Sequence, residues 1–450
     1  MAIVNRSALE DKLAQSADVV PAKILADVRE FLVSAPDPLL VNMNPFRLAA
    51  AWRVDRVAAL KAFLHLTRKG LFNLYWTVHC PSCKGATQES QTLASLRHGS
   101  SCPFCRIDFA AGFDRSVAVN FSVNPAVIKP GDMDDFTRFA GSFELEPGIN
   151  IELDPGESHY LKTNLKTGNY MFVVPEDKKA FNVAVSGGKP SAPQKLTLSY
   201  DDSAGLLTVV KAQEGEAELL LTNSTGAPKE LVFSRMATPR WPSAALVSSL
   251  QEFRDLFSSQ MLSLDETFAI ESLAFLFTDI KGSTELYERL GDSEAFYLVK
   301  EHFHIMERIV RANNGAVVKT IGDAVMAVFM DPPDALRSAV EMIDAFEDLE
   351  TAKKLRNAII VKVGVHYGPC IAVTLNEKLD YFGTTVNIAA RVQGLSDGRD
   401  VMASDSFYRE SDAAAYLSRK SWNGEPFTTS LKGLKSSYTV HKLTRPVTRP

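Results

Sequence analysis

Two aspartates stand where apolar, strand-forming runs meet turns. Asp279 follows the run 273–277 (LAFLF), and Asp323 lies in an Ile-Gly-Asp turn between two β-rich runs, which predicts a hairpin. Because strand ends hold side chains rigidly, two such carboxylates can share hard divalent cations, which prefer oxygen ligands. Each aspartate taken alone is typical of a turn or a helix N-cap. The joint pattern, with Lys319 four residues before Asp323, favours a metal site.

The residues after Asp279 add a second chemical feature. Lys281, Gly282, Ser283 and Thr284 lead into a helical pattern, so their backbone N–H groups lie at a predicted helix start. Such groups can bind phosphate oxygens. Carboxylates, a divalent metal and a phosphate cradle together indicate chemistry on a nucleoside triphosphate.

Four sequence blocks carry a resemblance to a known family. In chain order they read FTDIKGST, KTIGDAVMAVF, VGVHYGPC and LDYFGTTVNIAARV. On these blocks the segment from about Ala274 to Leu443 resembles the catalytic domain of class III nucleotidyl cyclases. The resemblance implies a ferredoxin-like α/β domain at residues 271–445. It also implies conversion of ATP to cyclic AMP and pyrophosphate, or of GTP to cyclic GMP, with two Mg²⁺ or Mn²⁺ ions in each active site.

The resemblance also assigns roles to individual residues. It implies metal binding by Asp279, Asp323 and the backbone carbonyl of Ile280, base recognition by Lys319 and Asp380, ribose orientation and transition-state stabilisation by Asn387 and Arg391, and phosphate contact by Lys432. The family builds its site between two catalytic domains. Since this chain has one such domain carrying both halves, the resemblance implies a homodimer with two equivalent sites.

Hydrogen-bonding chemistry favours adenine over guanine at the base-recognition pair. Lysine only donates and ionised aspartate only accepts, so Lys319 suits the adenine N1 acceptor and Asp380 suits the N6 amine. Guanine presents a donor and an acceptor in the inverted order. Each wrong pairing leaves a buried polar group unsatisfied, at a cost of roughly 1–3 kcal/mol. We therefore expect ATP as the substrate, with a guanylate cyclase as the alternative.

Four of the five cysteines form two CxxC pairs, Cys80-x-x-Cys83 and Cys102-x-x-Cys105. This spacing is typical of a zinc ribbon, which we place at residues 79–108. Four thiolates close a tetrahedral shell, so we expect a structural Zn²⁺ ion without a catalytic role. The alternative is two pairs of reduced or redox-active thiols.

Residues 1–78 read as helices followed by a strand, with Asp55 as an N-cap between two of the helices. This order weakly resembles a winged helix. One interpretation is DNA binding by the basic residues Arg53, Arg56, Arg68 and Lys69. We favour the other, a packing and dimerisation module, because the second helix is mostly apolar. We do not expect nucleic acid as a partner.

The region 110–237 shows short alternating runs separated by turn residues, which predicts an antiparallel β-sandwich. Its place ahead of an effector domain suggests a regulatory role with an unidentified ligand or protein partner. Residues 238–270 read as a helical linker, with apolar positions three or four residues apart from Leu246 to Met261. This helix either pairs across the dimer or covers its own domain.

Composition sets the outer bounds. The 450 residues are 46% hydrophobic and 23% charged, with a formal net charge of −5, which is ordinary for a globular protein and gives no general attraction to nucleic acid or membranes. With no apolar run long enough to span a membrane, we expect a cytoplasmic α+β protein of several domains. Two function classes remain: a regulated cyclase, or a zinc-ribbon and winged-helix binding protein that uses its C-terminal domain to sense nucleotides.

Overall fold

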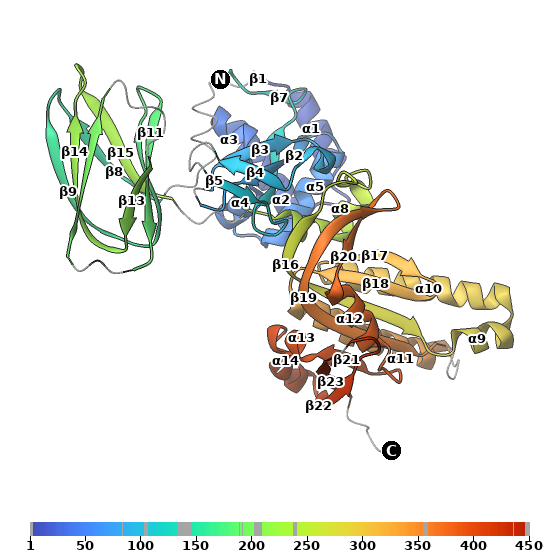
Figure 1. Cartoon of the computed structure of the whole chain (residues 1–450). Helices are drawn as coiled ribbons and strands as arrows, with labels where there is room; N and C mark the ends of the chain where they lie inside the picture. The colour runs from blue at the N-terminus through green and yellow to red at the C-terminus, as the bar shows by residue number, and fades with distance from the viewer. Residues whose placement is uncertain are drawn as a thin grey trace.

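The computed structural model describes residues 3–82, 84–102, 107–132, 146–188, 190, 192–201, 209–236, 241–353, 359–434 and 436–445. Figure 1 shows three parts: a β-sandwich that stands apart, a helix-rich part, and a C-terminal domain built on a long twisted sheet. We call the described residues between 3 and 132 the N-terminal module. Among the described residues, no helix combines the length and the apolar character that a membrane span needs.

The N-terminal module begins with helices and continues with short strands. Its elements are β1 (Ile3–Val4), α1 (Arg6–Ala14), α2 (Ala22–Ser34), α3 (Asp37–Val41), α4 (Pro45–Trp52), α5 (Arg56–Arg68), β2 (Phe72–His79), β3 (Ala86–Ser90), β4 (Gly99–Cys102), β5 (Ile107–Ala110), β6 (Val117–Val123) and β7 (Ile128–Lys129), with a 3₁₀ turn at Leu93–Ser95. Strands β3, β2 and β6 form one sheet in that order, and β4 pairs with β5.

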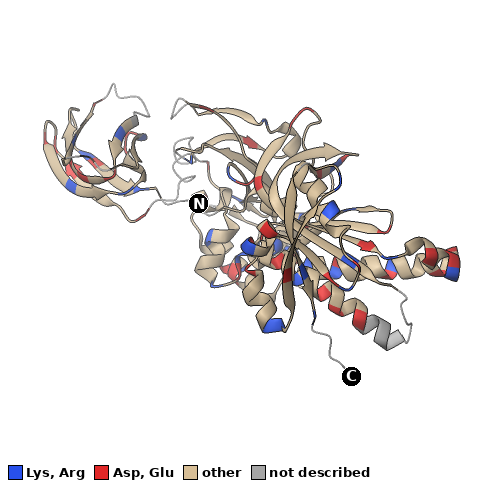
Figure 2. Cartoon of the chain, turned by 60° about the horizontal axis from the view of Figure 1, so that its bottom comes forward, with Lys and Arg blue, Asp and Glu red and all other residues tan. Residues whose placement is uncertain are grey.

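The predicted helix start at Asp55 is confirmed, because its side chain accepts a hydrogen bond from the N–H of Ala58 at 2.8 Å. The winged-helix interpretation gains no support. Seven of the thirteen residues of α5 are buried, whereas a helix that reads DNA must present a free face. The helices of this module also contain both basic and acidic residues, coloured blue and red in the cartoon of Figure 2. The packing role is therefore the better interpretation of α5.

The strand Val117–Val123, which the alternating pattern assigned to the sandwich, belongs to the N-terminal module instead. As β6 it pairs antiparallel with β2, with Tyr75 opposite Asn120. Six of its seven residues are buried. A strand covered on both faces needs a partner inside a core, and β2 supplies one next to the helices.

The sandwich consists of two sheets around its own apolar core. Its strands are β8 (Ile149–Leu153), β9 (Ser158–Leu165), β10 (Gly168–Val174), β11 (Lys179–Ser186), β12 (Gln194–Tyr200), β13 (Val209–Gln213), β14 (Gly215–Asn223) and β15 (Lys229–Arg235). The sheet orders are β13-β11-β10-β15-β8 and β12-β14-β9. The predicted β-sandwich is present, but its pairing needs a correction: β11 pairs parallel with β13 and β12 pairs parallel with β14, whereas the other strand pairs are antiparallel.

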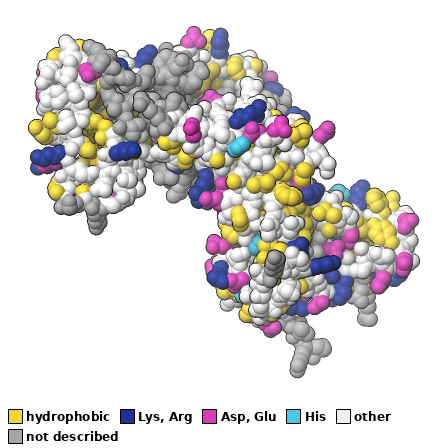
Figure 3. All heavy atoms as spheres, viewed as in Figure 1, with side chains coloured by type: hydrophobic (Ala, Val, Ile, Leu, Met, Phe, Trp, Pro, Cys, Tyr) yellow, Lys and Arg dark blue, Asp and Glu magenta, His cyan; other side chains and the backbone are white. Residues whose placement is uncertain are grey.

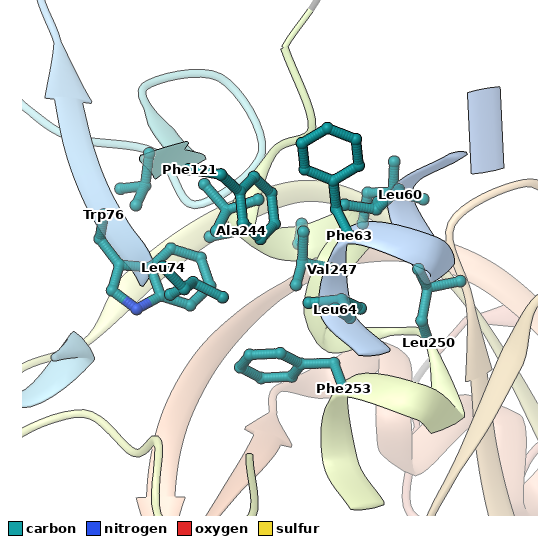
Figure 4. Close-up of a cluster of buried hydrophobic side chains, with 14 of the residues drawn as sticks. Leu60, Phe63, Leu64, Leu74, Trp76, Phe121, Ala244, Val247, Leu250 and Phe253 are labelled. Carbon is teal, nitrogen blue, oxygen red and sulfur yellow. The ribbon is translucent and has the colours of Figure 1, made fainter. Parts of the chain in front are cut away.

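The predicted linker helix is two short helices, α7 (Ala244–Ser248) and α8 (Gln251–Leu256). Leu246, Leu250 and Phe253 are buried within this chain. Figure 4 shows Val247, Leu250 and Phe253 beside side chains from α5, β2 and β6. The segment therefore covers its own chain, as the second of the two interpretations expected, and its apolar face is already used.

The C-terminal domain is an eight-stranded sheet flanked by helices. Its elements are β16 (Phe268–Ile280), α9 (Ser283–Leu290), α10 (Asp292–Ala312), β17 (Gly315–Ile321), β18 (Ala324–Phe329), α11 (Pro332–Lys353), β19 (Val361–Leu375), β20 (Lys378–Phe382), α12 (Thr384–Gln393), β21 (Val401–Ser404), α13 (Asp405–Glu410), α14 (Ala413–Lys420), β22 (Asn423–Ser430) and β23 (Ser437–Thr444). The strand order is β17-β18-β16-β19-β21-β23-β22, and β20 pairs with β19.

The two faces of this sheet belong to different cores. Ala274 and Leu276 of β16 pack with α10 and α11 in one cluster. Phe275 and Phe277, which alternate with them, join a second cluster that contains α12, α7, α8 and the N-terminal module. The N-terminal module and one face of the C-terminal sheet therefore share a continuous apolar core.

Candidate active site

The two aspartates of the predicted metal site meet at one end of the sheet. Strand β16 ends just after Asp279, and Asp323 lies in the turn between β17 and β18. The β16–β18 register pairs Thr278 with Val325, which brings that turn beside the end of β16. The N–H of Ile280 donates to Oδ2 of Asp323 across 3.3 Å. The hairpin prediction is confirmed, and Gly322 adopts a φ of +65° at its turn.

The electrostatics of this pair suit a cation. Burial raises the pKa of the Asp279 carboxyl above its ordinary value, and the nearby Asp323 carboxylate raises that pKa further, while Lys362 opposes the shift. The described residues contain no cluster of three His, Cys, Asp or Glu side chains that could hold a metal. Two carboxylates alone still fit Mg²⁺, which is commonly held by one or two carboxylates together with substrate phosphates and water.

The predicted phosphate cradle needs one correction. The N–H of Lys281 donates to the carbonyl of Ile360 at 2.8 Å, so it is already used. The ammonium of Lys281 donates to the carbonyl of Asp397, also at 2.8 Å. The turn continues through Gly282 with a φ of +66° into α9, which starts at Ser283. Gly282, Ser283 and Thr284 stand at the helix start, where N–H groups lack intrahelical partners.

The base-recognition residues predicted from the resemblance lie in direct contact. Nζ of Lys319 on β17 is 2.5 Å from Oδ2 of Asp380 on β20. The other Asp380 oxygen accepts the N–H of Tyr381 at 2.8 Å, and the Asp380 side chain is almost fully buried. A charged donor and a charged acceptor are thus fixed side by side.

A break in strand register places Lys319. Val317 pairs with Ala327, yet Lys319 pairs with Met326, so one extra residue is inserted between them. Such a β-bulge redirects the side chains that follow it. Val317 packs with the α10–α11 cluster, whereas Val318 and Met326 belong to the opposite cluster. The bulge therefore moves Lys319 to the sheet face that carries Met326.

Asn387 and Arg391 lie four residues apart on α12 and share one side of it. Ile388, Ala389 and Val392 bury the other side, while Asn387 is exposed and Arg391 half-buried. A Cβ added to Gly433 would lie 3.5 Å from Nη2 of Arg391, so the turn after Lys432 approaches that guanidinium closely. Leu431 is buried and anchors this turn, and Lys432 itself is exposed.

The described part of the predicted ribbon contains two of its four cysteines. Cys80 and Cys102 are buried at the ends of β2 and β4, and Cys83 and Cys105 lie outside the described residues. The N–H of Cys80 donates to the carbonyl of Gly85 at 2.9 Å, which closes a tight turn. Zinc binding stays a prediction.

Sequence patterns missed several residues that support the site. Lys362 lies directly opposite Asp279 in the β16–β19 register. Gln251 and Arg254 of α8 bond to strands β17 and β20. The apolar periodicity predicted a helix in this region but gave no sign that its polar residues reach the catalytic strands.

Comparison with known proteins agrees with the sequence resemblance. Residues 266–440 match the sequence model of the adenylate and guanylate cyclase catalytic domain, and residues 4–134 match a family of unknown function (DUF5939). The chain is 35% identical over 158 residues to an adenylate cyclase of Lachancea kluyveri, covering 31% of this chain and 8% of that protein. It is 31% identical over 147 residues to an adenylate cyclase of Streptomyces coelicolor, covering 32% of this chain and 36% of that protein.

Among solved structures, the adenylyl cyclase CyaB from P. aeruginosa is 20% identical with a TM-score of 0.35, covering 41% of this chain and 98% of that chain. The sequence matches identify residues 266–440 as a cyclase catalytic domain. This chain spans far less than two thirds of the length of the two curated relatives.

Proposed function

We propose that this chain is an adenylate cyclase that converts ATP to 3′,5′-cyclic AMP and pyrophosphate. The observation that carries the proposal is the contact between Lys319 and Asp380, in a domain whose sequence matches the cyclase family. Nζ can donate to adenine N1 while the Asp380 carboxylate accepts from the N6 amine. Guanine in the same pose would place its N1–H donor against the Lys319 ammonium and its O6 acceptor against the Asp380 carboxylate. Neither hydrogen bond could then form.

The reaction forms a bond between the ribose 3′-oxygen and the α-phosphorus and breaks the bond from that phosphorus to the bridging oxygen of pyrophosphate. The hydroxyl proton leaves to solvent, with no protein base assigned. Divalent cations held by Asp279 and Asp323, with the Ile280 carbonyl, would lower the pKa of the 3′-hydroxyl and offset charge on pyrophosphate. The closeness of the two carboxylates supports this assignment: burial raises the pKa of the Asp279 carboxyl, the Asp323 carboxylate raises that pKa further, and a bound cation would offset both effects.

The remaining residues act by position and charge. Arg391 would stabilise the charge that spreads over the α-phosphoryl oxygens, as guanidinium groups do in phosphoryl transfer. Asn387, on the same side of α12, would hold the ribose. Lys432 and the N–H groups from Gly282 to Thr284 would bind phosphates, with Lys281 contributing no free N–H.

We also propose that the active sites form between two copies of the chain. The aspartate pair would come from one copy and the base-binding and α12 residues from its partner. Exposed apolar side chains support a dimer: Phe296 and Tyr297 near the start of α10, and Phe382 at the end of β20. Figure 3 shows hydrophobic side chains gathered over both of these regions. Larger apolar patches often mark interaction surfaces.

Incubation of the purified 450-residue chain with ATP or GTP and with Mg²⁺ or Mn²⁺ tests the proposal, with products separated by chromatography. We expect cyclic AMP as the main product. Asp279→Ala and Asp323→Ala should abolish it while the chains stay folded, and Asp265→Ala, at an exposed position outside the site, should not. Nucleotide binding without any cyclic product under every metal would instead support the nucleotide-sensing alternative. Cyclic GMP as the main product would support a guanylate cyclase.

A further inference from the structure

The segment formed by α7 and α8 lies between the N-terminal module and the strands that carry the base-recognition pair. Its apolar side chains fill the cluster shown in Figure 4, where Phe253 meets Trp76 of β2 edge to face, with ring centroids 5.7 Å apart. Its polar side chains point to two strands of the catalytic sheet. They do so next to Lys319 and Asp380, the two residues proposed to read the base.

Arg254 of α8 holds the strand that carries Asp380. Its Nη1 donates to the carbonyl of Leu379 at 2.9 Å, and its Nε donates to the carbonyl of Ser248 at 2.9 Å. The guanidinium carbon also stands 5.5 Å from the centroid of the Tyr381 ring. A guanidinium fixes several partners in one geometry because its donors form a planar fork. Arg254 therefore contacts both residues that flank Asp380.

A second bond reinforces the same strand. The Ser248 and Tyr381 hydroxyl oxygens lie 2.9 Å apart, and both side chains are fully buried. Buried hydroxyls need partners, because an unsatisfied one costs the full desolvation penalty. This requirement fixes the end of α7 against β20.

Gln251 of α8 holds the strand that carries Lys319. Its Oε1 accepts the N–H of Val317 at 2.8 Å. β17 is the edge strand of the sheet, and Val317 is the last residue in register before the bulge. Because the bulge decides which face Lys319 occupies, a bond at its start stabilises the position of that lysine.

An ion pair joins α8 to the N-terminal module. Nζ of Lys61 on α5 lies 3.3 Å from Oε1 of Glu252, and the two side chains are only 20% and 10% exposed. The same ammonium donates to the carbonyl of Arg311 at the end of α10, at 3.3 Å. α8 is therefore held on one side by α5 and on the other by strands β17 and β20.

We propose that Arg254 and Gln251 are positioning residues for the nucleobase and that the N-terminal module, through Lys61, sets their place. The inference rests on the proposed function, since it assigns a control point to the same base pocket. A displacement of α8 changes the distance between Lys319 and Asp380, and thereby the affinity for adenine and its preference over guanine. Turnover of bound ATP is affected less, because Arg254 and Gln251 hydrogen-bond to Ser248, Leu379 and Val317, which belong neither to α12 nor to the metal aspartates.

The test is Arg254→Met, which keeps the aliphatic bulk and removes every donor. We expect the KM for ATP to rise roughly tenfold, as for loss of a charge-assisted hydrogen bond, with a smaller change in kcat. The ratio of kcat/KM for ATP over GTP should fall by a similar factor. Arg254→Lys, with fewer donors, should restore part of the loss. Arg97→Met is the matched control, because Arg97 also donates to two backbone carbonyls, those of Ala94 and Leu96, but in the ribbon region.

A second variant and its matched control test the role of the N-terminal module. Lys61→Met should shift KM and the ATP:GTP ratio in the same direction. Lys23→Met should not, although Lys23 also bonds one carboxylate, that of Asp27, and one carbonyl, that of Trp52. If Arg254→Met and Lys61→Met leave both quantities at the values of their controls, the proposal is wrong. Unfolding curves confirm that each variant is folded, and Gln251→Leu replaces Arg254→Met if the latter is not.

A binding measurement separates this inference from the proposed function. Titration calorimetry with 3′-deoxy-ATP and 3′-deoxy-GTP, which lack the attacking hydroxyl, reports base preference without turnover. If the wild-type chain makes no cyclic nucleotide but Arg254→Met still reduces its preference for 3′-deoxy-ATP, the cyclase proposal fails and the positioning role stands. If the wild-type chain is active and the binding preference of Arg254→Met is unchanged, the positioning role fails alone.

Discussion

Lys319 and Asp380 stand 61 residues apart in the sequence and touch in the structure, with Nζ 2.5 Å from Oδ2. The Lys319 side chain is 39% exposed and that of Asp380 is 8% exposed. The interaction with the Lys319 ammonium therefore offsets much of the desolvation cost of the buried Asp380 carboxylate. Without nucleotide the two residues satisfy each other. In the proposed function, adenine would insert into this contact and replace one strong interaction by two hydrogen bonds, which would make the pair sensitive to the hydrogen-bonding pattern of the base.

The first prediction concerns this pair. Lys319→Met and Asp380→Asn should each lower kcat/KM for ATP by about 10- to 100-fold, the equivalent of one or two lost hydrogen bonds in a buried site. The double variant should lose less than the product of the two, because the residues act together. Steady-state kinetics of the wild type, the two single variants and the double variant measure these losses. The control is Lys378→Met, which changes an exposed lysine of β20, the strand that carries Asp380. Strictly additive losses would contradict a shared base site.

The second prediction uses the raised pKa of Asp279. Since the folded chain binds this proton more tightly than the unfolded chain, the associated stability is present at low pH and is lost as pH rises through the folded pKa. Near neutral pH the carboxylate therefore destabilises the metal-free fold. Asp279→Asn should raise the Tm at about pH 7 without metal and change it less at about pH 4.

Added metal should reduce or reverse the difference in Tm between Asp279→Asn and the wild-type chain. Mg²⁺ or Mn²⁺ binds the native state and should raise the Tm of the wild-type chain more than that of Asp279→Asn. Asp265→Asn, at an exposed position, should respond like wild type. Equal metal-induced shifts in wild type and Asp279→Asn would remove Asp279 from the metal site.

The third prediction concerns the homodimer. Asp279→Ala and Arg391→Ala should each be inactive, yet in a heterodimer one site inherits both lesions and the other is intact. Random pairing of equal amounts gives about half heterodimers, so a mixture should recover roughly a quarter of wild-type activity, a consequence of two-fold symmetry. Because slow exchange can hide this, both chains should be co-expressed with different tags. A purified heterodimer as inactive as its parents would rule out shared sites.

The fourth prediction concerns the cysteines. We expect about one zinc ion per chain, lost in Cys80→Ser or Cys102→Ser, with local unfolding because metal binding supplies folding free energy there. Metal analysis and thermal unfolding of the purified chain measure both effects. Cys370→Ser, at a buried position in β19 outside the ribbon, is the control for zinc content. A metal-free chain with intact disulfides by mass spectrometry would overturn the prediction.

The local elements of the site can be predicted from short stretches of sequence. The apolar run before Asp279 and the Ile-Gly-Asp turn at Asp323 predicted strand β16 and the β17–β18 hairpin, and both are present. The N-cap at Asp55 and the strand that follows the helices of residues 1–78 were likewise predicted. These features depend on periodicity, turn chemistry and capping, which are properties of neighbouring residues and are therefore legible in one sequence.

Which elements become partners could be learned from the three-dimensional structure but not from the local sequence. The alternation of Val117–Val123 predicted a strand but not its pairing with β2, and the apolar face of α7 and α8 predicted burial but not against which surface. The bulge that redirects Lys319 has no local signal, since it arises where β17 adjusts its register to β18. Pairing and register are set by packing between distant segments, whose free energy depends on the whole core and not on any single stretch of the chain.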